Sequence, residues 1–298
     1  MHPSPKLIAG ALASTLAAPA LADEPVEIRF AGEFAGNPFS CAQAYDGIGR
    51  TASTVEVADY RLYVSNLRLL TADGGEVPVV LDQDGIWQSG DVALLDFEDG
   101  AGACVNGTPP TNMTVRGTAP AGDYAGIAFD VGVPFAQNHV DPTLEGSPMN
   151  LTAMFWNWQG GYKFLKLDLA TAGQPLAAPQ EAEDHAGDGA SGEAARGWSL
   201  HLGSTGCASS SRTTPPSSPC AAPNHVPVRF EGFDPASHVV VVDPARVLVD
   251  ADVDTNAPDT SPGCMSFPGD ADCLTVMARL GLAYDGVPAG EQALVSMR

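Results

Sequence analysis

Apolar and polar residues alternate with a period of two along much of this chain. Side chains of an extended strand point alternately to the two faces of a sheet, so this period predicts half-buried β-strands. Segments that alternate in this way, or that form short apolar runs, cover residues 26–30, 54–70, 77–81, 92–97, 127–131, 164–169, 198–202, 226–230 and 239–242. The sequence Ala72-Asp-Gly-Gly75 lies between two of them and predicts a hairpin turn.

Helical signals are few and short. The chain holds 32 glycines and 25 prolines, too many for a mainly helical protein. Asp243-Pro244 predicts the start of a short helix that reaches residue 249, and residues 274–280 predict another. We therefore expect an all-β protein, an antiparallel β-sandwich or a barrel-like domain with long loops and disulfides.

This β-rich domain is expected to extend over residues 23–298. Two segments inside it predict solvated loops rather than domain boundaries. Residues 172–196 are acidic and rich in Ala and Gly, and residues 207–220 hold a run of Ser, Thr and Pro.

The first 22 residues have the features of a secretory signal peptide. Lys6 precedes an apolar, Ala-rich stretch at residues 7–18, and Ala20-Leu-Ala22 has the small-x-small pattern of a cleavage site. That stretch is too short to span a bilayer, and no second long apolar run follows, so we expect an exported protein without a membrane span.

The formal net charge is −22. A field of this sign repels nucleic-acid phosphates and anionic lipid surfaces, which argues against both as partners. It favours cations and basic proteins, although solubility alone is sufficient reason for an acidic exported protein.

Six cysteines in an exported chain predict disulfides. Proximity in the sequence pairs Cys207 with Cys220 and Cys264 with Cys273, which leaves Cys41 for Cys104. A thiolate metal site is the weaker alternative, because no Cys-x-x-Cys pair occurs.

Residues 154–168 hold two of the four tryptophans. If this segment is extended, Met154, Trp156 and Trp158 project to one face, where they form either a block of core or a chemical site. Trp87 and Trp198 are interpreted as packing residues.

Two of the six histidines have a sequence context that favours a role as metal ligands. His139 lies in the loop that precedes it, and His201 interrupts an apolar strand, where a buried imidazole requires a partner. No two histidines have the close spacing of a local metal motif, so any metal site must be assembled by the fold. Structural or surface roles are expected for His185, His225 and His238.

Sequence motifs of the common enzyme classes are absent. The chain has no Gly-x-Ser-x-Gly elbow, His-Glu-x-x-His pair, phosphate-binding loop or dinucleotide fingerprint, and we do not expect an enzyme. From the residues alone, the favoured function is an exported β-sandwich module whose aromatic strand binds a carbohydrate or a protein.

Several sequence blocks, spread in order over the chain, resemble the methanobactin-operon periplasmic protein family, also called metallo-mystery-pair four-Cys-motif proteins. The two most specific blocks are Trp156-Asn-Trp158-Gln-Gly-Gly-Tyr-Lys-Phe164 and His201-Leu-Gly-Ser-Thr-Gly-Cys207. The others are Phe30-Ala-Gly with Phe39-Ser-Cys41, Asp59-Tyr-Arg-Leu-Tyr-Val-Ser-Asn66, Leu94-Leu-Asp-Phe-Glu98 with Cys104, Gly132-Val-Pro134, Asn138-His139 and Gly263-Cys-Met265.

The resemblance implies a periplasmic copper-binding protein made alongside a di-haem partner of the cytochrome c peroxidase type. It further implies that this partner oxidises a tryptophan to kynurenine and that copper binding depends on the change. Trp156 or Trp158 is the expected site of oxidation. Imidazole and thioether groups suit copper, and the expected ligands are drawn from His139, His201, Trp156, Trp158 and Met154, with Met149 nearby in the chain and His238 as a lower-ranked candidate.

Overall fold

The computed structural model of the protein describes residues 22–175 and 196–298, and strands dominate both parts. The helices are α1 (Phe135–Asn138), α2 (Cys273–Arg279) and the 3₁₀ helices η1 (Thr152–Met154) and η3 (Pro244–Val247). The strands are β1 (Asp23–Phe34), β2 (Asn37–Pro38), β3 (Ala44–Ile48), β4 (Ser53–Thr71), β5 (Glu76–Pro78), β6 (Val80–Leu81), β7 (Gln88–Ser89), β8 (Val92–Asp96), β9 (Thr114–Pro120), β10 (Tyr124–Val131), β11 (Phe155–Asn157), β12 (Gly161–Pro175), β13 (Arg196–Gly203), β14 (Val226–Glu231), β15 (Val240–Val242), β16 (Gly263–Cys264) and β17 (Val295–Met297).

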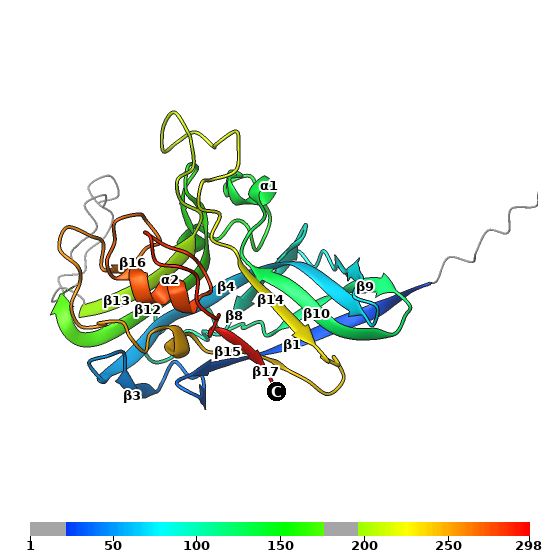
Figure 1. Ribbon diagram of the computed structural model, residues 1–298, viewed down its shortest axis with the longest axis horizontal. Coiled ribbons are helices and arrows are strands. Elements are labelled where there is room, and N and C mark those ends of the chain that lie inside the picture. The colour runs from blue at the N-terminus through cyan, green and yellow to red at the C-terminus, as the bar shows by residue number, and fades with distance from the viewer. Residues whose placement is uncertain (1–21, 176–195) are drawn as a thin grey trace, which may run out of the picture.

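These strands form two sheets. The larger has the order β14-β10-β4-β12-β13-β16, and the smaller has the order β17-β15-β1-β9-β6. Figure 1 shows the long strands β4, β12 and β13 running along the molecule above β1 and β15 of the smaller sheet. A ring contact between Phe30 of β1 and Phe129 of β10 joins the sheets, and the buried Tyr60 hydroxyl of β4 donates to the Val242 carbonyl of β15 at 2.8 Å. The prediction of an all-β sandwich is confirmed.

The 19-residue strand β4 is the common neighbour of most strands in the larger sheet. Arg61 and Leu62 pair with β12 and with β8, so these two strands occupy opposite edges of β4. Val64 and Ser65 pair with β10 and with β8, which places β10 on the same edge as β12. Along this edge the partner of β4 therefore changes from β12 to β10 near Tyr63, and the sheet forks there.

Other features of the sequence also agree with the structure. Residues 72–75 turn between β4 and the antiparallel β5. Helix η3 begins after Asp243, whose side chain accepts a hydrogen bond from Ala245 N, and it ends at Val247 rather than at residue 249. Helix α2 overlaps the second predicted segment and is shifted by one residue toward the N-terminus. The apolar stretch 77–81 is divided, because β5 joins the larger sheet and β6 the smaller.

The acidic loop is shorter than predicted. Strand β12 continues to Pro175 and β13 begins at Arg196, because the two strands pair at this end as well. The remaining residues of the loop and residues 1–21 of the predicted signal peptide lie outside the described parts of the chain. Within those parts, no helix has the length and apolar character needed to cross a membrane.

Three disulfides join Cys41 to Cys104, Cys207 to Cys220 and Cys264 to Cys273. These are the pairs that proximity in the sequence suggests. Trp198 is 1 % exposed and belongs to the core, and Trp87 packs against it, as their interpretation as packing residues requires.

A row of charged side chains, the charged row, crosses the larger sheet below its surface. It consists of Glu98, Arg61, Asp59, Lys166 and Asp168. Arg61 Nε lies 3.0 Å from Glu98 Oε1 and 3.0 Å from Asp59 Oδ1. Lys166 pairs with Asp59 and lies 2.7 Å from Asp168 Oδ2. Signs alternate along the row, so each buried charge has an opposite neighbour that offsets part of its desolvation.

Glu98 is the least compensated member of the charged row. It is 0 % exposed, and neither of its carboxylate oxygens has a hydrogen bond of acceptable geometry despite the short approach of Arg61. Burial, reinforced by the charge of Asp59, raises the pKa of Glu98 to about 8, and burial raises the pKa of the neighbouring Asp96 to about 7. The native state therefore holds protons on these carboxyl groups that the unfolded chain releases at lower pH.

We predict that Glu98→Gln changes the pH dependence of stability. The carboxyl group titrates near 4.5 in the unfolded chain and near 8 in the native protein. Between these values the native state binds more protons, so the parent's free energy of unfolding falls as pH rises through this window. Denaturant unfolding from pH 4 to 9 should show the variant more stable at the alkaline end, by on the order of a few kcal/mol. Parallel curves for parent and variant would contradict the assignment.

Candidate metal centre

The tryptophan segment is bent rather than extended. Met154 is the last residue of η1, β11 covers only three residues, and Trp158 begins the turn at 158–160 that leads into β12. The expectation that Met154, Trp156 and Trp158 share one face is therefore wrong. Its physical reason is the irregular pairing of β11 with β12, where Asn157 already faces Gly161.

Trp156 packs against the larger sheet. A Cβ atom on Gly203 of β13 would lie 2.5 Å from Cζ3 of its indole, so the ring rests directly on this glycine. Its other ring neighbour is Phe267, with ring centroids 5.3 Å apart. Trp156 is partly buried and Phe267 is 46 % exposed, so this aromatic pair reaches the molecular surface.

Trp158 has different surroundings. Its ring contacts Phe155, with centroids 6.4 Å apart, and its backbone carbonyl lies 3.1 Å from His139 Nδ1. The two indoles thus have different neighbours, because the Trp156 ring rests on β13 whereas the Trp158 ring contacts Phe155 of β11. The two tryptophans therefore have different environments and are expected to differ in their reactivity and in the ligands near them.

His139 follows α1 and is buried, with 7 % of its surface exposed. The Trp158 carbonyl can only accept, so Nδ1 carries the proton and Nε2 keeps its lone pair, toward which the Asn138 amide lies at 3.2 Å. Asn138 in turn accepts from the backbone N–H of Tyr162, which ties this turn to β12. Burial lowers the pKa of His139, and the imidazole is neutral at neutral pH.

His201 of β13 stands at the end of the charged row. Its Nε2 lies 2.7 Å from Asp168 Oδ1, so Nε2–H donates a hydrogen bond to the ionised carboxylate. Burial alone would raise the pKa of Asp168, but His201 and Lys166 hold it well below its usual range. Burial lowers the pKa of His201 itself. Among the described residues no hydrogen bond reaches Nδ1, which is the ring nitrogen left with a lone pair.

Both imidazoles therefore have the arrangement typical of metal ligands, in which one ring N–H is held by an oxygen and the other nitrogen keeps a lone pair. His201 and Gly203 are two positions apart in β13 and face the same side of the sheet, so His201 is associated with Trp156. His139 is associated with Trp158. The hydrogen bonds and ring contacts of the two histidines involve different residues.

The remaining predicted candidates lie apart from these groups. Met154 and Met149 are 0 % and 1 % exposed and belong to the hydrophobic core. His238 accepts from the backbone N–H of Asp234 and contacts Phe233. His225 bonds to the Val133 carbonyl, as its structural interpretation requires, and His185 lies outside the described residues.

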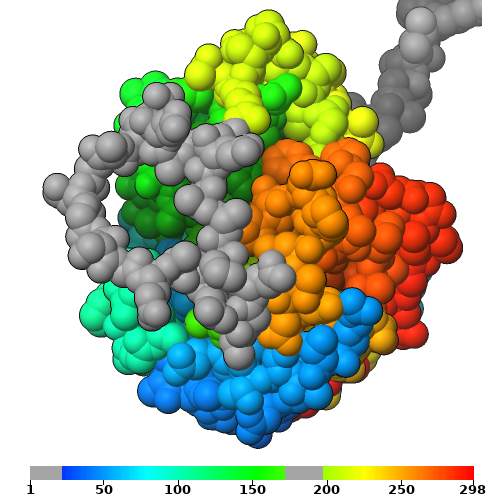
Figure 2. All heavy atoms as spheres, turned by 90° about the vertical axis from the view of Figure 1, so that its left-hand side faces the viewer, coloured from blue at the N-terminus to red at the C-terminus, as the bar shows by residue number. Residues whose placement is uncertain are grey.

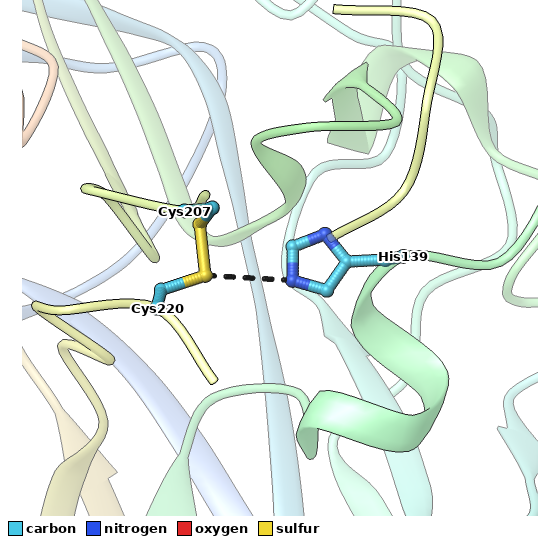
Figure 3. Close-up of side chains that lie close together, drawn as sticks. All are labelled: His139, Cys207 and Cys220. Carbon is cyan, nitrogen blue, oxygen red and sulfur yellow. Dashed lines mark hydrogen bonds between the residues drawn. A yellow bond between two sulfur atoms is a disulfide. The ribbon is translucent and has the colours of Figure 1, made fainter. Parts of the chain in front are cut away.

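The sequence did not reveal that one disulfide lies against His139. Cys220 Sγ is 3.6 Å from His139 Nε2, and both cysteines of the 207–220 loop are buried (Figure 3). In Figure 1 this loop rises beside α1 at one end of the larger sheet, and Figure 2 shows it adjoining the orange segment around residues 250–270. The pairing of the cysteines was predictable, whereas their approach to a histidine far away in the sequence depends on tertiary structure.

We predict that Gly203→Ala moves the Trp156 indole. The new methyl group would overlap Cζ3 of the ring and approach the Tyr162 carbonyl at 2.9 Å, which should cost about 1–3 kcal/mol of stability. Tryptophan emission should shift toward that of a more exposed indole, and the shift should vanish in a Trp156→Phe background. Gly146→Ala is the matched control, because no atom lies within 4 Å of its Cβ position. An unchanged spectrum for Gly203→Ala would contradict the packing described.

Comparison with known proteins identifies the family. The family model MbnP matches residues 23–266. Among solved structures, MbnP from Methylosinus trichosporium is similar to this chain, with 31 % identity and a TM-score of 0.76 over 93 % of this chain and 99 % of the other. Comparison with the curated proteins gives no match. The chain belongs to the MbnP family of methanobactin-operon periplasmic proteins.

Proposed function

We propose that this protein binds copper in the periplasm, at a site that depends on the oxidation of Trp156 or Trp158 to kynurenine by a di-haem, peroxidase-like partner. The observation that supports the proposal is that the fold brings a buried imidazole to the backbone of Trp158 and another to the strand on which the Trp156 indole rests. Trp156 rests on Gly203 beside His201, and the Trp158 carbonyl holds His139. The protein is a client of the oxidation and not itself an enzyme.

The donor atoms suit copper. Neutral imidazole nitrogens bind it well, and both histidines are kept neutral by burial. With the partner reducing two equivalents of hydrogen peroxide to water, oxidation would cleave the indole C2–C3 bond and leave one oxygen atom on each carbon. Hydrolysis by one water molecule would then release C2 as formate. The product carries an aryl amine and a ketone, which supply a nitrogen ligand that an intact indole lacks.

The surface around Trp156 also suits contact with a partner. Trp156 is partly buried, and the adjoining Phe267 is 46 % exposed, so an oxidising protein can approach this indole without unfolding of the core. The formal net charge of −22 favours association with a basic face.

A second function is favoured by the same aromatic pair. Trp156 and the exposed Phe267 form a surface of the kind that stacks on sugars or apolar side chains. A binding module of this type would need neither copper nor modified tryptophan, so the two functions differ in whether partner-dependent oxidation changes the protein.

We predict that one of Trp156→Phe and Trp158→Phe abolishes partner-dependent copper binding. Phenylalanine keeps an apolar ring but cannot become kynurenine, whereas the variant at the unmodified position should lose mainly stability. The measurements are intact mass, peptide mapping of residues 150–166 and copper content after co-production with the partner. Four intact tryptophans in protein that carries full copper would exclude the modification.

We predict that His139→Ala and His201→Ala each lower the copper content of partner-treated protein. Each change removes a neutral donor nitrogen, and the thermal transition should remain close to that of the parent. His238→Ala provides the comparison, because its imidazole interacts with a turn elsewhere in the chain. If both variants bind copper like the parent, the ligands lie elsewhere. Loss of the folded state would instead mean that the imidazole is structural.

A further inference from the structure

The ligand atoms of His139, Cys207 and Cys220 lie within 4.8 Å of one another in the buried interior of the loop region. Figure 3 shows the imidazole edge facing the disulfide, with Nε2 directed at Cys220 Sγ. One imidazole nitrogen and two sulfur atoms this close together could supply the three ligands of a trigonal metal site once the sulfurs separate. In the oxidised protein the sulfurs are bonded to each other and cannot act as thiolates.

We propose that reduction of the Cys207–Cys220 disulfide creates a second, thiolate-based metal site, in which the two cysteines and His139 bind Cu(I). It goes beyond the proposed function, because it requires no modified tryptophan and exists in the reduced state of the protein. Soft thiolate ligands favour Cu(I), and two thiolates with one imidazole satisfy a trigonal ion.

His139 is already oriented for this role. The Trp158 carbonyl holds its Nδ1–H, which directs the Nε2 lone pair toward the sulfurs. Such an outer hydrogen bond fixes the ring and its tautomer in established metal sites. On binding a metal ion, His139 Nε2 would lose only its 3.2 Å contact with the Asn138 amide.

The two cysteines are held together by more than their own bond. Thr205 and Ala222 exchange two backbone hydrogen bonds of 2.9 and 3.0 Å, and Ala221 N donates to Gly206 O at 3.1 Å. Gln159 Nε2 also donates to the Cys207 carbonyl at 3.0 Å. Because these bonds close the base of the loop without the disulfide, reduction would leave the thiols near His139.

A dithiol reductant supplies the two electrons that reduction of the disulfide requires. A thioredoxin-like dithiol protein would break the Cys207–Cys220 bond and form its own disulfide, leaving one proton on each cysteine sulfur. Cu(I) would then replace both protons, which pass to the solvent, and the site would carry a charge of −1. The other two disulfides provide internal comparison, since among the described residues neither is part of a His/Cys/Asp/Glu group with metal-binding separations.

The test uses the whole mature protein made without the di-haem partner, so that its tryptophans stay intact. Protein reduced with a phosphine and protein left oxidised are titrated anaerobically with Cu(I) against a chromophoric chelator. Reduced protein should bind one Cu(I) and show an ultraviolet thiolate-to-metal band, and the oxidised protein should show neither. Cys264→Ser/Cys273→Ser should keep the reduced-state site, whereas Cys207→Ser/Cys220→Ser should lose it.

His139→Ala keeps both thiols and should weaken Cu(I) binding by at least about tenfold. Trp156→Phe and Trp158→Phe should bind like the parent, which separates this site from the proposed kynurenine-dependent one. Circular dichroism reports whether each reduced variant stays folded. Equal Cu(I) binding by folded Cys207→Ser/Cys220→Ser and parent overturns the proposal, and so does binding of Zn(II) without Cu(I).

Discussion

The two edges of β4 are the constraint on which the rest of the larger sheet depends. A strand residue can pair with one neighbour on each edge, and β4 has more neighbours than edges. The solution is a fork, in which β12 takes one half of an edge and β10 takes the other. At the fork the Tyr63 carbonyl accepts from Gly132 N, the residue just after β10. The chain then enters α1 and the turn of His139, so the fork places this histidine beside the β11–β12 turn.

The two histidines are therefore held by parts of the fold that differ in rigidity. His201 lies within the strand β13 and is held by a carboxylate whose own charge is balanced in the charged row. His139 lies on a loop, where it is held by hydrogen bonds to the Trp158 carbonyl and the Asn138 amide and by its contact with the neighbouring disulfide. Strands position ligands more accurately than loops, whereas loops allow a site to adjust to a changed side chain or redox state.

Much of the fold was predictable, because alternating strands and local disulfides leave their pattern in the sequence. Asp243-Pro244 predicted a helix start because its signal is local: the Asp243 side chain accepts a hydrogen bond from Ala245 N and proline occupies the first helical position. Strand β9 gave little apolar signal, since Val115 is the one large residue at its buried positions and the others are Gly117 and Ala119. The candidate site was less predictable. The turn at Trp158 and the contact of His139 with Cys220 join residues far apart in sequence, and no local pattern encodes them.

The charged row has a consequence for how this sequence can change over time. Asp59, Lys166 and Asp168 come from two strands that are distant in the chain, yet each neutralises its neighbour in the protein interior. Asp59 pairs with both Arg61 and Lys166, so its replacement takes from these two cations the carboxylate they share, and breaking a buried pair typically costs about 3–5 kcal/mol. A lineage can therefore cross from this row to an apolar one only through paired substitutions. Related sequences should carry Arg61, Asp59 and Lys166 together or replace all three, and intermediate combinations should be rare.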